Sequence, residues 1–206
     1  MHLLQVVPLF AGLAASLAIE PRQATGPAGV QIASIAFSGT GCSTQTLPAS
    51  ILTNSTDVPV PQTTWVAESG KDNTRVVPTN LNCQIIIRVN HPAGWQYSLV
   101  KADYYGRVKL PANTEAASKT TYSFSGNSQT RTSQYYFDGP FDGIYFRNDR
   151  YTGTNRQWSP CGTGSSLNIT SEVRVGPLGS GNTRPTSMDI FNLLGGKIGL
   201  NWQTCR

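Results

Sequence analysis

Histidine is scarce in this chain, which contains only His2 and His91 among its 206 residues. Because His2 lies in the N-terminal apolar run, a Ser-His-Asp triad or a histidine–metal site would have to use His91. That residue stands in Asn90-His91-Pro92-Ala93-Gly94, where the proline and the glycine predict a turn. A Gly-x-Ser-x-Gly nucleophile elbow is also missing. The sequence therefore predicts no catalytic residue and no cofactor, and it favours a protein that is not an enzyme.

Long hydrophobic runs are missing after Ala18. Met1–Ala18 is apolar, too short to span a bilayer comfortably, and ends in Ser16-Leu17-Ala18, which is typical of a removable signal peptide. We predict a flexible leader over residues 19–29, with a pro-segment ending at Arg22, and a single domain over residues 30–206. No later stretch approaches the roughly 20 apolar residues of a membrane helix. The sequence thus predicts a secreted protein, extracellular or in a cell wall, with no membrane partner.

The predicted domain contains four cysteines, Cys42, Cys83, Cys161 and Cys205. An even number in an exported chain indicates two disulfides, and three pairings are formally possible. The spacings match no zinc pattern, so we predict no metal at these residues. Two N-glycosylation sequons, at Asn54 and Asn168, agree with export.

Charged residues are also few, at 13% of the chain, whereas glycine and proline number 20 and 13. This composition is typical of a protein rich in strands and turns. After the signal, no segment keeps a long 3.6-residue apolar period, so few helices are expected. The formal net charge of +5 is dispersed along the chain, which argues against nucleic-acid binding.

Short apolar segments separated by Gly, Pro, Asn or Asp predict an all-β fold. In Cys83–Val89, the alternation places Ile85, Ile87 and Val89 on one face with Cys83, as in a half-buried strand. We predict a single disulfide-braced two-sheet β-sandwich of jelly-roll or immunoglobulin-like type, with a closed barrel as the alternative. The expected strands are Val30–Phe37, Thr63–Ala67, Cys83–Val89, Trp95–Leu110, Thr120–Phe124, Gln134–Phe137, Gly143–Phe146, Ser166–Val175, Met188–Leu193 and Ile198–Gln203.

Acidic residues gather in Asp138-Gly139-Pro140-Phe141-Asp142-Gly143. Two carboxylates on one tight loop suit glycoside hydrolysis when their separation is right, so Asp138 and Asp142 are candidate hydrolase residues. The turn dipeptides Gly-Pro and Asp-Gly explain the same residues without catalysis. A weaker hypothesis is a calcium site formed by Asp138, Asp142 and Asp149.

Aromatic residues crowd the middle of the chain. Adjacent pairs such as Tyr104-Tyr105 must point to opposite faces of a strand, so some rings are expected to face solvent. Exposed rings on a rigid sandwich can stack on sugar rings, although core packing explains many of them as well. The candidate stacking residues are Trp95, Tyr97, Tyr105 and Tyr136.

The cysteines stand within a series of short motifs spread along the predicted domain. These motifs are Ser38-Gly39-Thr40-Gly41-Cys42, Asn82-Cys83-Gln84-Ile85, His91-Pro92-Ala93-Gly94-Trp95-Gln96-Tyr97, Tyr105-Gly106, Trp158-Ser159-Pro160-Cys161-Gly162, Leu167-Asn168-Ile169 and Trp202-Gln203-Thr204-Cys205. In this order they resemble a family of small secreted fungal proteins known as domain of unknown function 4360 (DUF4360). The resemblance implies an all-β secreted domain in which Cys42 pairs with Cys83 and Cys161 with Cys205. It also implies a filamentous fungal source and no assigned activity.

Three functional hypotheses follow from these observations. The first is a secreted, non-catalytic β-sandwich glycoprotein that interacts with an extracellular surface, either wall polysaccharide or a host or neighbour protein. The second is a polysaccharide hydrolase that uses Asp138 and Asp142. The third is a structural cell-wall component without a discrete ligand.

Overall fold

The computed structural model describes residues 26–47, 50–51, 57–59, 64–69, 80–175, 186–191 and 197–205. The predicted signal peptide Met1–Ala18, the pro-segment to Arg22 and the sequon at Asn54 lie outside these residues. Among the described residues, no helix is long and apolar enough to cross a membrane.

The described chain is almost entirely strand, with one short 3-10 turn at Gly153–Asn155. This confirms the predicted all-β class. The strands are β1 Gln31–Ser38, β2 Gln45–Leu47, β3 Ser50–Ile51, β4 Asp57–Pro59, β5 Thr64–Ser69, β6 Asn80–Leu110, β7 Glu115–Phe124, β8 Thr130–Asp138, β9 Phe141–Arg150, β10 Gly162–Val175, β11 Thr186–Phe191 and β12 Lys197–Thr204.

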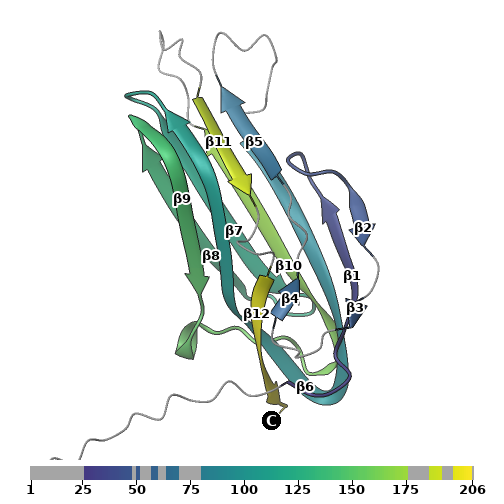
Figure 1. The fold of residues 1–206 in the computed structure, drawn as a ribbon. Helices are drawn as coiled ribbons and strands as arrows, with labels where there is room; N and C mark the ends of the chain where they lie inside the picture. Colours follow the sequence, from purple (N-terminus) through teal and green to yellow (C-terminus); the bar gives the residue numbers. More distant parts are fainter. Residues whose placement is uncertain are drawn as a thin grey trace, which may run out of the picture.

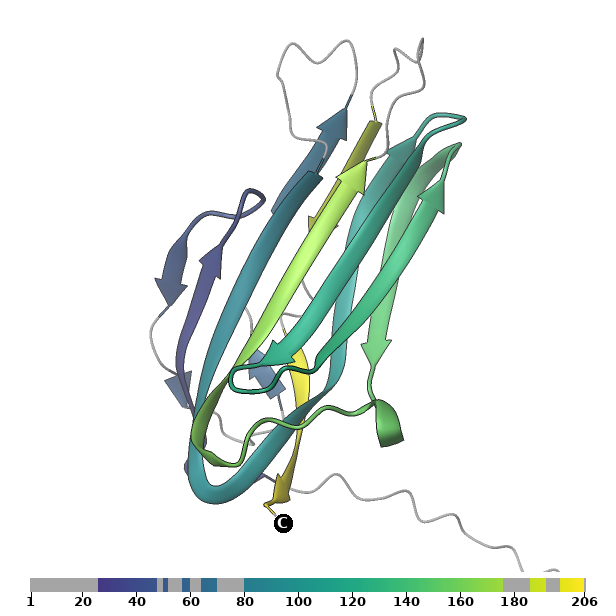
Figure 2. The same ribbon diagram turned by 180° about the vertical axis from the view of Figure 1, so that it is seen from behind.

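The strands form two packed layers, and the long strand β6 belongs to both (Figure 1). In layer one, the strand order is β2-β1-β6-β10-β7-β8, and the first part of β6 pairs with β1 and β10. In layer two, the second part of β6 pairs with β9, β11 and β12. Figure 2 shows layer one in front, with β8, β7, β10 and β6 side by side. The pairings are antiparallel, and the two layers pack face to face, which makes a β-sandwich folded around one bent strand.

The predicted turn at Asn90–Gly94 is wrong, because β6 continues through it as a bend. On both sides of the bend the strand keeps its β10 partners, with Asn90 opposite Gly164 and Trp95 opposite Gly162. Gly94 has a φ of 78°, a backbone angle that glycine adopts without the steric cost of a side chain. The register shifts between these two pairs, so the pairing with β10 is interrupted at the bend and resumes beyond it. The sequence pattern marked the change of direction but not this resumption of pairing.

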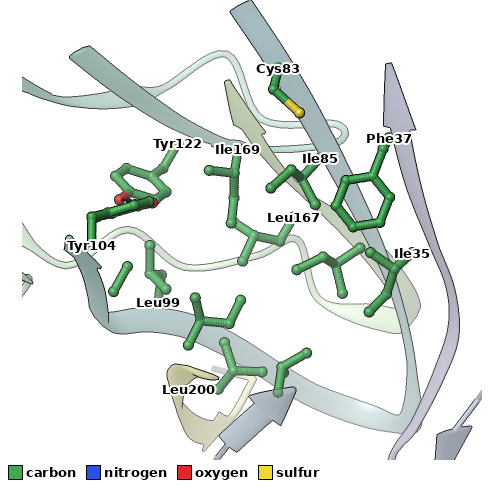
Figure 3. Packing of buried hydrophobic residues seen from close by; sticks show 14 of the residues in the cluster. Ile35, Phe37, Cys83, Ile85, Leu99, Tyr104, Tyr122, Leu167, Ile169 and Leu200 are labelled. Carbon is green, nitrogen blue, oxygen red and sulfur yellow. Dashed lines mark hydrogen bonds between the residues drawn. The ribbon is translucent and has the colours of Figure 1, made fainter. Parts of the chain in front are cut away.

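The core lies between the two layers and is built from alternate residues of each strand (Figure 3). Cys83, Ile85, Ile87 and Val89 are all buried, which confirms their predicted common face. Fully burying one such aliphatic side chain contributes about 1.5–3 kcal/mol. Layer one supplies Ile35, Phe37, Leu167 and Ile169, and layer two supplies Leu99 and Leu200.

Two disulfides brace the sandwich. Cys42, which follows β1, bonds to Cys83 of β6, and their Cα atoms are 5.5 Å apart. Cys161, just before β10, bonds to Cys205, just after β12, with a Cα separation of 5.9 Å. The first bond joins neighbouring segments of layer one, whereas the second ties layer one to layer two near the bend of β6.

A buried polar network joins β9 of layer two to β7 of layer one. Arg147 of β9 is only 1% exposed and donates to the Ser118 hydroxyl at 2.8 Å and to the Thr120 hydroxyl of β7. Its guanidinium lies 4.2 Å from the centre of the Tyr104 ring and 3.4 Å from the Asp149 carboxylate. Inward-pointing charges of this kind also protect an edge strand such as β9 from pairing with another chain.

Tyrosine hydroxyls complete this network. Tyr122 donates to Asp149 at 2.6 Å, and the Tyr104 and Tyr122 hydroxyls are 2.7 Å apart. Ser133 of β8 donates to the other Asp149 oxygen at 2.7 Å. Burial raises the pKa of Tyr104 from the ordinary 10.0 to about 12, and it also raises the pKa values of Tyr122 and Tyr151.

These raised pKa values predict a loss of stability in alkali. A group whose pKa is raised by folding stabilises the folded state below its ordinary pKa, and this contribution is lost as the pH climbs through the folded value. For Tyr104 the window runs from pH 10.0 to about 12. In an alkaline titration, tyrosinate absorbance from this residue should appear together with loss of the near-ultraviolet circular dichroism. Comparison with a Tyr104→Phe variant isolates its signal, and ionisation near pH 10 in a native protein would contradict the prediction.

Candidate functional site

A groove of about 230 Å³ lies on the outer face of layer one, across β6, β10, β7 and β8. On β7 and β8 alternate residues point outward, so Ala117 and Tyr136 share this face. Ala117 stands in register between Tyr136 of β8 and Arg174 of β10. Neighbouring strands are about 4.8 Å apart, so the backbones at Tyr136 and Arg174 are about 10 Å apart, and their side chains flank the small Ala117. Tyr136 is 70% exposed.

The groove carries balanced charge. Lys119 of β7 forms an ion pair of 3.1 Å with Glu172 of β10, and both side chains are half-exposed. Arg174 and Glu115 also line the groove, and within the described part of the chain neither forms an ion pair. Two cations therefore accompany two anions, and Gln134 beside them adds uncharged hydrogen-bonding capacity.

A second exposed aromatic group lies on the opposite side of the sandwich, on the outer face of layer two. Tyr105 of β6 and Phe146 of β9 are cross-strand partners, with ring centres 6.4 Å apart at 28°. Phe146 is 62% exposed and Ile144 is 65% exposed. Tyr105 was predicted from the sequence as a candidate stacking residue, whereas Ile144 and Phe146 were not. Ile144 and Phe146 alternate with Tyr145 and Arg147 along β9, so the sequence could place each pair on one face. It could not show which pair is exposed and which is buried.

Comparison with protein families gives a decisive match to the model described as Domain of unknown function (DUF4360), over residues 28–205. The chain belongs to the DUF4360 family. A relative from the fungus Arthroderma benhamiae, an "Uncharacterized secreted protein", is 32% identical over 153 residues. That match covers 74% of this chain and 62% of the relative, so the chain spans less than two thirds of the relative's length. Together with the two disulfides, this places the DUF4360 chain among secreted proteins.

Two solved structures show similarity at low levels. One is TmCBM61 in complex with beta-1,4-galactotriose, with 10% identity and a TM-score of 0.31, covering 70% of this chain and 89% of that chain. The other is the enzymatically active domain of tailspike protein 4 of bacteriophage CBA120, with 11% identity and a TM-score of 0.23, covering 72% and 19%.

Among the DUF4360 motif residues, Tyr97 was wrongly predicted to stack on a ligand. It is 0% exposed, and its ring packs against Phe124 and Trp202, each 5.2 Å away between ring centres. Its hydroxyl donates to the Ser165 carbonyl at 3.2 Å, and burial raises its pKa. The bend of β6 turns this residue toward the core.

His91 and Trp95 belong to the same motif. His91 is buried, with its ring edge-on to Tyr97 and Trp202 at 5.8 and 5.4 Å. Trp95 is half-buried and packs against the core, so only part of its ring faces solvent. This stretch of the DUF4360 pattern therefore builds the core beneath the bend of β6. Of the candidate stacking rings, Tyr136 and Tyr105 lie on opposite faces and do not form one site.

The hydrolase hypothesis for Asp138 and Asp142 is contradicted by their placement. Asp138 ends β8 on the outer face of layer one, opposite Glu115, whereas Asp142 lies on the outer face of layer two. The two carboxylates thus point to opposite sides of the sandwich and cannot flank one glycosidic bond. Asp142 also accepts a 2.9 Å hydrogen bond from Arg107, which lowers its pKa.

The calcium hypothesis fails for a related reason. Asp149 is buried, and its two oxygens accept hydrogen bonds from Tyr122 and Ser133. Along β9, Asp149 is seven residues from Asp142, or about 23 Å at 3.3 Å per residue. The described residues contain no cluster of three metal-binding side chains.

Asn168, the described sequon asparagine, lies within β10 between buried Leu167 and Ile169, so it belongs to the outer face of layer one.

Proposed function

We propose that this secreted protein binds an extracellular polysaccharide without catalysis, through the groove around Tyr136. The observation that carries the proposal is an aromatic ring, 70% exposed, on the wall of a polar groove. A ring held by a rigid strand can stack on the apolar face of a sugar, because little side-chain entropy is lost on binding.

The polar part of the groove supports the same ligand class. Sugar hydroxyls both donate and accept hydrogen bonds, and the groove offers acceptors at Glu115 and Glu172 and donors at Arg174 and Gln134. The two positive and two negative side chains balance, which suits an uncharged polymer better than a strongly acidic or basic one. The groove lies on the outer surface of layer one, so a polymer can lie across it without inserting a chain end.

The test is retention of the pure protein on insoluble chitin, β-glucan and cellulose, with salt and soluble-sugar competition. Retention on one of these polymers should resist salt and yield to the soluble sugar. Tyr136→Ala should weaken the affinity about tenfold, or about 1.4 kcal/mol, because the stacking surface is removed. A Tyr136→Phe variant should keep most of the affinity.

The matched control is Thr132→Ala. Thr132 precedes Tyr136 on β8, points to the same face and lies outside the groove. This variant should bind like the wild type. Equal retention of the Tyr136→Ala variant, or no retention of the wild type on any polymer, would contradict the proposal and direct attention to a protein partner.

A further inference from the structure

The outer face of layer two carries a second surface, here called the β9 strip. It is formed by the outward residues of β9 and of the second part of β6, paired across the two strands. Its centre is apolar: Ile144 and Phe146 are both more than 60% exposed, and Tyr105 lies beside Phe146. Together these side chains form a small contiguous apolar patch, whereas exposed apolar residues scattered singly are normal on a protein surface.

Hydrogen-bonded ion pairs stand at both ends of this apolar centre. At one end Arg107 donates to Asp142 at 2.9 Å. At the other end Asp103 accepts hydrogen bonds from Asn148, at 3.0 Å, and from Arg150. Lys101 also lies 3.6 Å from Asp103. Each carboxylate of the strip thus pairs with an arginine whose own side chain is about half-exposed.

We propose that the β9 strip is a second polysaccharide site, so that one molecule of the protein cross-links two polymer chains. This inference rests on the proposed function of the groove. The exposed ring of Phe146 and the half-exposed ring of Tyr105 lie between carboxylates and guanidinium groups. Stacking surface, hydrogen-bond acceptors and hydrogen-bond donors thus stand in one row, which is the combination that a chain of uncharged sugars can use.

The size of the apolar centre favours a sugar polymer over a protein partner. A stable protein interface buries about 800 Å² on each side and has an apolar core. Here the exposed apolar surface comes from two side chains and part of a third, and ion pairs follow on both sides along the strands. A protein that covered the strip would have to desolvate these charges, whereas sugar hydroxyls hydrogen-bond to them and leave them partly hydrated.

The two sites lie back to back. Tyr136 points away from the core on layer one, and Phe146 points away from it on layer two. Beneath them, Arg147 of β9 bonds to Ser118 of β7, so the same region of the sandwich separates the two faces. Packed sheets are about 10 Å apart. Two polymer chains can therefore be held at once without touching each other.

A bridging assay on the full chain tests the inference. The polymer retained in the experiment above is used twice: as an insoluble phase that captures the protein, and as a soluble fluorescent form of the same polymer. The wild type should retain the fluorescent polymer on the solid. Phe146→Ala should still bind the solid through the groove but should lower the retained fluorescence at least tenfold. Since Phe146 is exposed, this variant is expected to fold.

Controls separate the possible readings. Tyr136→Ala should also lose bridging, and its weakened residual retention on the solid should come from the strip. Thr132→Ala should bridge like the wild type. A wild type that binds but does not bridge, or a Phe146→Ala variant that bridges normally, overturns the cross-linking inference while the groove proposal stands. Binding that is lost in Phe146→Ala and unchanged in Tyr136→Ala overturns both.

The molar mass in solution tests whether bridging comes from a dimer of the protein. Light scattering during gel filtration should give a monomer for the wild type and for Phe146→Ala. A wild-type dimer that Phe146→Ala dissociates would show that the strip joins two copies of the chain, and it would overturn the polysaccharide assignment. Failure of the wild type to bind any polymer refutes the groove proposal itself, which the first experiment detects before bridging is measured.

Discussion

Replacing Arg147 by methionine is expected to lower the free energy of unfolding by about 3–5 kcal/mol, the usual cost of removing one partner of a buried ion pair. The guanidinium bonds to Ser118 and Thr120, lies against the Tyr104 ring and faces Asp149 at 3.4 Å. Methionine fills a similar space but leaves the Asp149 charge buried without its cation. Urea denaturation, followed by circular dichroism, gives the difference from the shift of the midpoint.

Two further variants show whether the charge is responsible. Arg147→Met combined with Asp149→Asn should recover part of the loss, because no uncompensated charge stays buried. Lys119→Met breaks the half-exposed pair with Glu172 and should change stability by only about 0–1 kcal/mol. A loss of less than 1 kcal/mol in the Arg147 variant would mean that the network is not an important source of stability.

Removing the Cys161–Cys205 disulfide should lower the free energy of unfolding by about 4 kcal/mol, from the chain-entropy model for a loop of this length. The sequence separation is 44 residues, and the bond joins the start of β10 to the end of β12. In a Cys161→Ala/Cys205→Ala variant the unfolded chain regains the freedom that the bond removes. The measurement is the urea midpoint in the absence of reductant.

The other disulfide supplies a matched comparison. Cys42 and Cys83 are separated by 41 residues, so the model gives almost the same value for their removal. Cys83 is fully buried, and a Cys42→Ala/Cys83→Ala variant also loses the packing of both sulfur atoms in and beside the core. We therefore expect the larger loss for this pair. Loss of less than 1 kcal/mol in both variants would show that loop closure contributes little here.

The sequence predicted local features of this fold well. Alternation in Cys83–Val89 gave the buried face of that strand, and Gly94 marked the change of direction in β6. The adjacent tyrosines Tyr104 and Tyr105 do lie on opposite faces, one buried and one half-exposed. These features depend on neighbouring residues alone, so a single strand is enough to establish them.

The candidate site was harder to predict, because exposure depends on the partner layer. Tyr97 and Tyr136 both occur in aromatic-rich strands, yet Tyr97 is enclosed by Phe124 and Trp202 while Tyr136 faces solvent. Asp138 and Asp142 are four positions apart but lie on different layers, because the chain crosses between layers within this short connection. Proximity in sequence therefore indicated a pair that the fold separates.

By itself, the sequence determined the all-β class, the outward and inward alternation within each strand, and a cysteine set that permits two disulfides. Family resemblance, rather than spacing, implied how those cysteines pair. Only the tertiary structure decided which of the two faces of each strand is covered. Period-two alternation fixes which residues share a face, but the other layer and the bend of β6 determine whether that face meets the core or water. For that reason Phe146 and Ile144 could be recognised as a surface only after β9 had been placed against β6.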